Sequence, residues 1–209
     1  MHERGAILGA IDAALRGPIT APTPPGKALI VWHEAAEKAF QKELSKYPEL
    51  SDFAKWHWQA SYMIERDDKQ ILEIGQLVRM LEKINNEVQD LVNNTGWSMF
   101  HVFRRPGIEP GYATDPEAGQ DDNDFVECAL LRDPERKDYG GFDMWRVAAG
   151  GKVALIREYW EDRPDFSRQL KTGPGTWLSP YWMTRSLAEF VRHSRGLAER
   201  FDASTEVSF

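Results

Sequence analysis

The residues best suited to chemistry lie between Asn93 and Gly111, where an aromatic run is followed by two arginines and two Pro-Gly pairs. Aromatic rings stack on bases or on a partner's apolar groups, and histidine and arginine bind anions. We therefore predict a binding face, with two tryptophans nearer the C-terminus as further anchors. Its residues are Trp97, His101, Arg104, Arg105, Trp177 and Trp182. The alternative places these rings in the core and pairs the arginines with surface acids.

A second candidate is a basic run in an acidic chain, formed by Arg185, Arg192 and Arg195 with His193 and Arg200 nearby. Such a run predicts an anion site on a helix, or a contact with a partner's acidic face. The alternative is an ordinary solvated helix surface.

Five carboxylates near the predicted strands define the enzyme alternative, because carboxylates on adjacent strands can hold Mg²⁺ for a hydrolase or nuclease. They are Glu127, Asp143, Glu158, Glu161 and Asp162. The Lys that commonly follows such a Glu two residues later is missing after Glu158. His33 is followed four residues on by Glu37, whereas a zinc helix needs a second His there. We predict no catalytic residue, metal or cofactor, and leave catalysis open.

Composition limits the partners. The chain has 209 residues and a net charge of −7. This charge argues against a stand-alone nucleic-acid binder, although a local basic patch leaves nucleic acid open. The single Cys128 fits a reducing cytoplasm, and no apolar run is long enough to span a bilayer. We expect a cytoplasmic protein without a membrane partner, whose partner is another protein.

The elements that would position these residues begin with a helical arm over residues 1–16 and a Pro-rich linker over 17–26. A helical region over 27–95 follows. It contains a helix over 28–47 and a second helix that begins at Ser51 or Asp52, with Trp56, Ala60 and Ile64 at helical spacing.

The longest predicted helix covers about residues 67–94, with apolar positions three and four residues apart. Asn85 occupies the one place in this seam where an apolar residue is missing. A wide apolar stripe favours packing within the chain, whereas a buried Asn can fix the register of paired helices. A homodimer through this helix therefore remains an alternative.

In the second half, residues 96–202, β-prone runs between turn residues predict strands at 97–103, 125–131, 142–148 and 153–160. Apolar residues at helical spacing predict a closing helix at about 183–201. Gly150-Gly151 marks a hairpin between the last two strands. The predicted fold class is α+β: a helical N-terminal half with a long central helix, a small antiparallel sheet of three or four strands and a C-terminal helix. We expect residues 27–95 and 96–202 to pack as one domain.

Several segments recur in the order known from one family. They are residues 95–103, 105–110, 143–147 and 155–162, followed by Gly175-Thr-Trp and the helix from Glu189 to Phe201. Over about residues 80–202 the chain resembles the C-terminal region of bacterial proteins that carry a divergent AlbA (Schlafen-like) DNA-binding domain. Residues 1–95 do not match that DNA-binding domain. The resemblance thus implies only an accessory interaction module.

These observations together predict a non-enzymatic interaction or regulatory component of a larger bacterial assembly, linked to a DNA-associated or defence system. The alternatives are the metal-dependent hydrolase or nuclease described above and a nucleic-acid-binding module.

Overall fold

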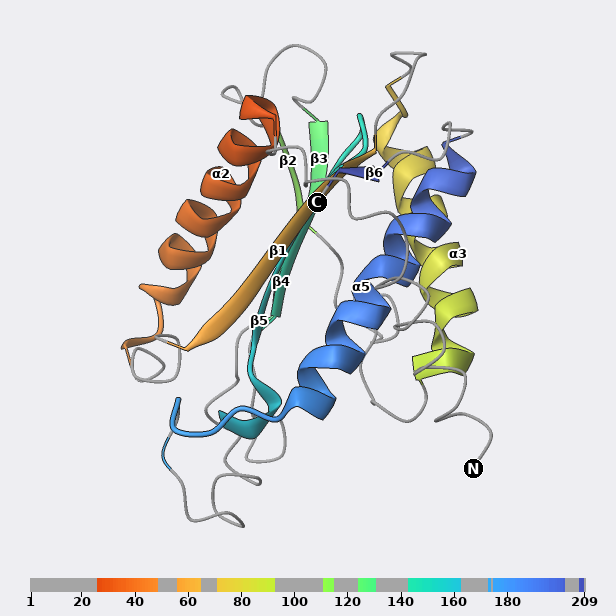
Figure 1. Cartoon of the computed structure of the whole chain (residues 1–209). Helices are drawn as coiled ribbons and strands as arrows, with labels where there is room; N and C mark the ends of the chain where they lie inside the picture. The colour runs from red at the N-terminus through yellow and green to blue at the C-terminus, as the bar shows by residue number, and fades with distance from the viewer. Residues whose placement is uncertain are drawn as a thin grey trace.

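The computed structural model describes residues 26–48, 56–64, 71–92, 111–114, 124–130, 143–162, 173, 175–201 and 207–208. One antiparallel sheet forms its centre, with helices on both faces (Figure 1). This arrangement confirms the predicted α+β class.

Within the described ranges, six strands form the sheet in the order β2-β3-β4-β5-β1-β6. They are β1 His57–Ile64, β2 Gly111–Thr114, β3 Asp124–Leu130, β4 Asp143–Ala148, β5 Lys152–Glu158 and β6 Val207–Ser208. The hairpin predicted around Gly150-Gly151 is confirmed between β4 and β5. Gly151 has φ 97°, a left-handed conformation that glycine adopts without steric cost.

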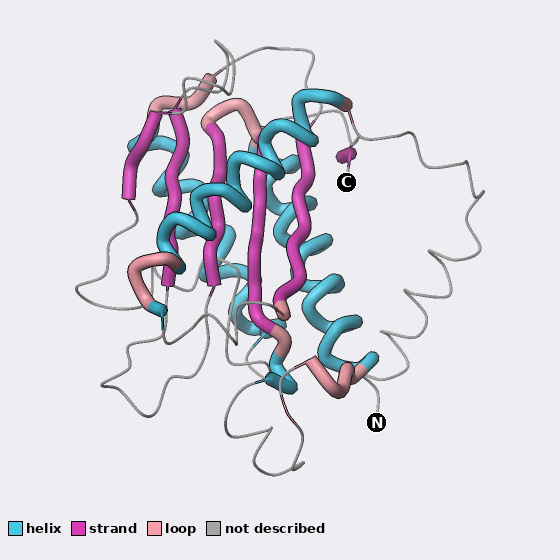
Figure 2. Tube along the Cα trace, turned by 90° about the vertical axis from the view of Figure 1, so that its left-hand side faces the viewer, coloured by secondary structure: helices cyan, strands magenta, loops and turns pink. Residues whose placement is uncertain are grey.

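Helix α2, Lys27–Leu44, covers one face, and α3, Ile74–Val92, and α5, Pro180–Arg200, cover the other (Figures 1 and 2). Successive side chains of a strand point to opposite faces, so each strand serves two cores. Val153 and Leu155 of β5 pack on the α3–α5 side, whereas Ala154 and Ile156 pack on the α2 side. Such burial on both faces explains why β4 and β5 are buried at every position.

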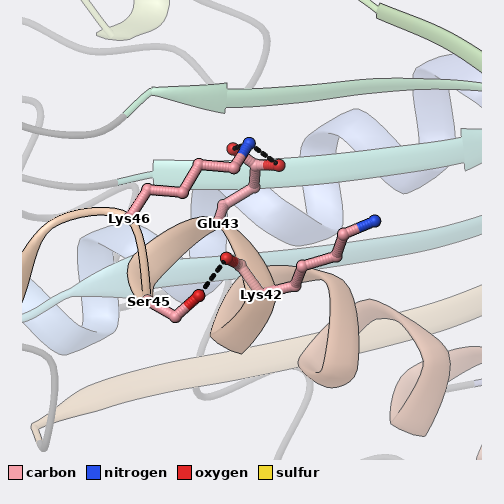
Figure 3. Close-up of polar contacts among 4 residues, drawn as sticks. All are labelled: Lys42, Glu43, Ser45 and Lys46. Carbon is pink, nitrogen blue, oxygen red and sulfur yellow. Dashed lines mark hydrogen bonds and ion pairs between the residues drawn. The ribbon is translucent and has the colours of Figure 1, made fainter.

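The end of α2 is held by local contacts (Figure 3). Ser45 Oγ donates to the carbonyl of Lys42 at 2.7 Å, and Lys46 Nζ lies 2.7 Å from Glu43 Oε1. These exposed contacts terminate the helix before the chain turns towards β1.

The predicted helix that begins at Ser51 or Asp52 is wrong where the structure describes it, because residues 57–64 form strand β1 beside β5. The predicted helix depended on Trp56, Ala60 and Ile64 at helical spacing, whereas Trp58, Tyr62 and Ile64 all lie on one face of the strand. The apolar pattern thus fitted two periods, and pairing with β5 decided between them. The remainder of that prediction, at residues 51–55, lies outside the described residues.

The sheet is larger than the sequence predicted, because no strand was predicted at the positions of β2 and β6. The strands predicted at 125–131, 142–148 and 153–160 and the closing helix are confirmed to within a few residues. The N-terminal arm and the predicted strand at 97–103 lie outside the described residues.

Helix α3 begins at Ile74, later than predicted, and buries Leu77, Leu81, Ile84 and Asn85. Gly196 of α5 lies against Ile84, so the stripe packs within the chain. A homodimer through this helix stays a prediction. No helix in the described part of the chain is both long and apolar enough to cross a membrane.

Candidate binding surface at the start of the last helix

The predicted binding face divides into two parts. Trp97, His101, Arg104 and Arg105 lie outside the described residues. Trp177 and Trp182 lie at the start of α5, where the chain leaves the sheet and turns into the helix. The candidate site is therefore built from this second part.

Two buried carboxylates fix the segment that leads into α5. Glu161 Oε1 accepts the backbone N–H of Ser179, and Asp162 Oδ1 accepts that of Gly175 at 2.8 Å. Both acids lie in a 3₁₀ turn, Trp160–Asp162, that directly follows β5. Burial raises the pKa of Asp162, against the opposing effect of the Gly175 N–H. The sheet thereby holds the segment from Gly175 to Ser179 in a defined position.

Gly175 has φ 71°, and the indole of Trp56 lies where a side chain at this position would project. Only glycine fits both the backbone conformation and the contact with the ring. The contact between Trp56 and Gly175 therefore joins the residue before β1 to the turn before α5.

Large apolar side chains remain exposed around this junction. The exposed fraction is 46% for Trp177, 55% for Tyr181 and 48% for Trp56. Leu178 is also exposed, and Trp182 is half-buried. We call these five residues the aromatic surface.

Arg185 is fixed over this surface. Its Nη1 donates to Tyr181 Oη at 2.7 Å, and its guanidinium carbon lies 5.5 Å from the Tyr181 ring and 5.9 Å from the Trp182 ring. The two rings are themselves in edge contact at 5.1 Å. A cation held over aromatic faces keeps its charge available to an anionic group on a partner. The surface thus combines apolar area with one positioned charge.

The other basic residues of α5 differ from Arg185 in their partners. Arg195 Nε lies 2.7 Å from Glu199 Oε1, and Arg200 pairs with Glu87 of α3. Arg192 is exposed. His193 is fully buried, so its place in a basic surface run was predicted wrongly. An anion site on Arg185, Arg192 and Arg195 remains a prediction.

Beneath α5 lies a buried ionic cluster that the sequence analysis missed. Arg157 Nε donates to Asp143 Oδ1 at 2.9 Å, and Arg157 Nη1 lies 3.5 Å from Glu189 Oε2. Burial lowers the pKa of His193 to about 3, with a further lowering from the positive charge of Arg157. The i, i+4 spacing of Glu189 and His193 was the available signal, because it places both on one side of the helix.

The five carboxylates of the enzyme alternative do not gather. Strand alternation places Asp143 on the α5 side, but Glu127 and Glu158 on the α2 side. Arg146 donates to Glu127 at 2.7 Å, and Glu161 and Asp162 accept the backbone bonds described above. Across the described ranges, no three His, Cys, Asp or Glu side chains are grouped as metal ligands.

On the opposite face, α2 contacts β1 through polar side chains. His33 Nδ1 lies 2.8 Å from Ser61 Oγ, and Glu37 Oε2 lies 3.5 Å from His57 Nε2. His33 and Glu37 therefore form a half-buried contact with the sheet.

Comparison with known proteins adds no family. No protein-family model matches the chain, and neither the curated proteins nor the solved structures contain a match to it.

Proposed function

We propose that this chain is a non-enzymatic interaction component of a larger bacterial assembly and binds another protein through the aromatic surface. The observation that carries the proposal is the exposure of Trp177 and Tyr181 on a segment anchored by Glu161 and Asp162. Tryptophan, tyrosine and arginine dominate the binding energy of protein interfaces. A rigid segment also loses little conformational entropy on binding.

Arg185 gives this surface a preference among partners. Its guanidinium, held by the Tyr181 hydroxyl, favours a partner that presents a carboxylate beside apolar groups. A link to a DNA-associated or defence system rests on the family resemblance alone. A cytoplasmic location is part of the proposal, and the buried free thiol of Cys128 supports it.

The test is affinity purification of the full chain from its native cells, followed by identification of the proteins that accompany it. We expect Trp177→Ala combined with Tyr181→Ala to reduce recovery of the partner at least about tenfold. Ile71→Ala is the matched control, because Ile71 is also an exposed apolar residue but precedes α3.

Thermal unfolding of each variant separates loss of binding from loss of fold. Equal recovery of the same proteins by the wild type and the double variant, with unchanged melting temperatures, would refute the proposal.

A further inference from the structure

A second surface, distinct from the aromatic surface, lies along the outer edge of β1. The N–H of Ile64 donates to the carbonyl of Gly151, so Ile64 and every second residue before it direct their backbone groups towards β5. The backbone groups of Gln59, Ser61 and Met63 consequently face away from β5. Within the described residues, β6 covers Met63 and Ile64 only.

Among the described residues, the outer edge at Gln59 and Ser61 is therefore a short template for another strand. Unpaired edges usually carry devices that prevent pairing, such as a bulge, a proline or a lysine. Strand β1 has regular pairing with β5 over its length and contains neither proline nor lysine. It can accept one more strand along this part of its length.

Exposed apolar residues of α5 lie over the same edge. Glu189 of α5 contacts Arg157 on β5, and Phe190 contacts Tyr62 on β1, with ring centroids 5.1 Å apart. Around the helix axis, the side that carries Glu189 therefore faces β5 and the side that carries Phe190 faces β1. The side that comes next in this direction extends beyond the outer edge of β1. Leu187 and Val191 occupy this next position and are 46% and 53% exposed.

Helix α2 borders the edge on the other face. His33 and Glu37 contact β1, and Ile30 lies on the same side of the helix and is 45% exposed. Glu34, also exposed, adds an acidic group to this side. The edge is thus bordered by an apolar helix flank on one face and a mixed, acidic flank on the other.

We propose that this edge is a homodimer interface, in which β1 of two copies pair antiparallel about a twofold axis at Gln59. Gln59 then lies opposite Gln59 of the second copy, and Ser61 opposite His57. Met63, which β6 covers, lies beyond the start of the second copy's β1. The two sheets become one continuous sheet.

Helix spacing favours a second copy over an unrelated strand. Because α5 lies over β5 and β1, a strand spacing of about 4.8 Å places the two α5 axes about 10 Å apart across the junction. Helices pack at about 8–10 Å, so the exposed Leu187 and Val191 of both copies would bury one another.

The same geometry keeps the acidic flanks apart. Helix α2 reaches across the sheet to Phe125 of β3, so its axis lies farther from the edge than that of α5. The exposed Glu34 side chains of the two copies therefore stay hydrated and need not be brought into contact.

The inference goes beyond the proposed function and uses other residues, so the two fail separately. The test is sedimentation equilibrium of the purified full chain, with Gln59→Pro and with Leu187→Lys combined with Val191→Lys. Proline at position 59 removes an N–H that faces outward and leaves the bonds to β5 in place. Ile71→Lys is the control for adding charge at an exposed apolar residue.

We expect a dimer for the wild type and the control, and at least about tenfold weaker association for both edge variants. Circular dichroism must show the native fold in each variant. A monomeric wild type at about 100 µM, against the micromolar affinity of modest interfaces, would overturn the proposal. A dimer that survives both edge variants would also overturn it, because another surface would then join the copies. Binding of an unlike partner strand by a monomeric chain would assign the edge to a different occupant.

Discussion

His193 provides a quantitative prediction about stability and pH. The imidazole is fully buried in α5 and faces the Arg157 guanidinium, and its pKa falls from 6.5 to about 3. Below pH 6.5 the unfolded chain binds a proton at this residue, whereas the folded chain does not until the pH approaches 3. Protonation therefore favours unfolding throughout this interval.

The size of the effect follows from the difference between the two pKa values. Each pH unit between them reduces the free energy of unfolding by about 1.4 kcal/mol, so the loss between pH 7.5 and pH 5 is about 2 kcal/mol. His193→Gln removes the titrating group but keeps a polar side chain of similar length. We expect the variant to be less stable at pH 7.5, yet to lose about 2 kcal/mol less than the wild type on acidification to pH 5.

The assay is urea unfolding at a series of pH values, with the midpoint and slope fitted at each one. The difference between the two pH profiles isolates His193, because the other titrating groups are common to both proteins. Parallel profiles for the wild type and His193→Gln would refute the reasoning, since the imidazole would then titrate alike in both states. Proton NMR of the histidine ring offers an independent measurement of its pKa.

Two further predictions concern Gly175 and Cys128. Gly175→Ala should lower the free energy of unfolding by about 1–3 kcal/mol, because alanine is strained at φ 71° and its methyl group meets the Trp56 indole. Gly173→Ala, which meets only an ordinary contact, is the control in urea unfolding, and equal stability of the two variants would contradict this account. Burial raises the pKa of Cys128 to about 12, with Asp143 adding to the effect, so iodoacetamide at pH 8 should modify it at least about a hundredfold more slowly in the folded chain than in urea. Rapid modification of the folded chain would contradict the buried position of the thiol.

The parts of the fold that local sequence determines were predictable. The hairpin between β4 and β5 follows from two adjacent glycines between β-prone runs, and Gly151 adopts the left-handed conformation that such a turn requires. The C-terminal helix followed from apolar residues at helical spacing. In both cases the signal lies within a few residues of the element that it determines.

Strand β1 was not predictable in this way, because its pattern fits two structures. Trp56, Ala60 and Ile64 recur at helical spacing, whereas Trp58, Tyr62 and Ile64 share one face of a strand. The decision depends on β5, which begins almost ninety residues later in the sequence. The short strands β2 and β6 were not predictable for the same reason, because each forms where a neighbouring strand supplies the pairing. Long-range pairing of this kind leaves little local trace.

The candidate site was predictable only in part. Trp177 and Trp182 were predicted as anchors because aromatic residues near turn glycines are favoured in interfaces, and that role stays a prediction. The roles of Glu161 and Asp162 could not be inferred, because the backbone N–H groups that donate hydrogen bonds to them lie 18 and 13 residues away in the sequence. A pattern that suggested metal binding therefore proved, in the structure, to be an anchor for the turn.

Helix α5 buries Phe190 and Leu197 as expected, but it departs from the usual distribution of side chains at four other positions, and this departure links the two proposals. It buries Glu189 and His193 against Arg157, and it leaves Leu187 and Val191 exposed. A helix of an isolated domain normally buries its apolar residues and hydrates its charges. Ionic groups beneath α5 fix its position on the sheet, since Arg157 joins β5 to α5 through Glu189. The apolar side chains are then held at the surface, where only contact with another protein can remove them from water.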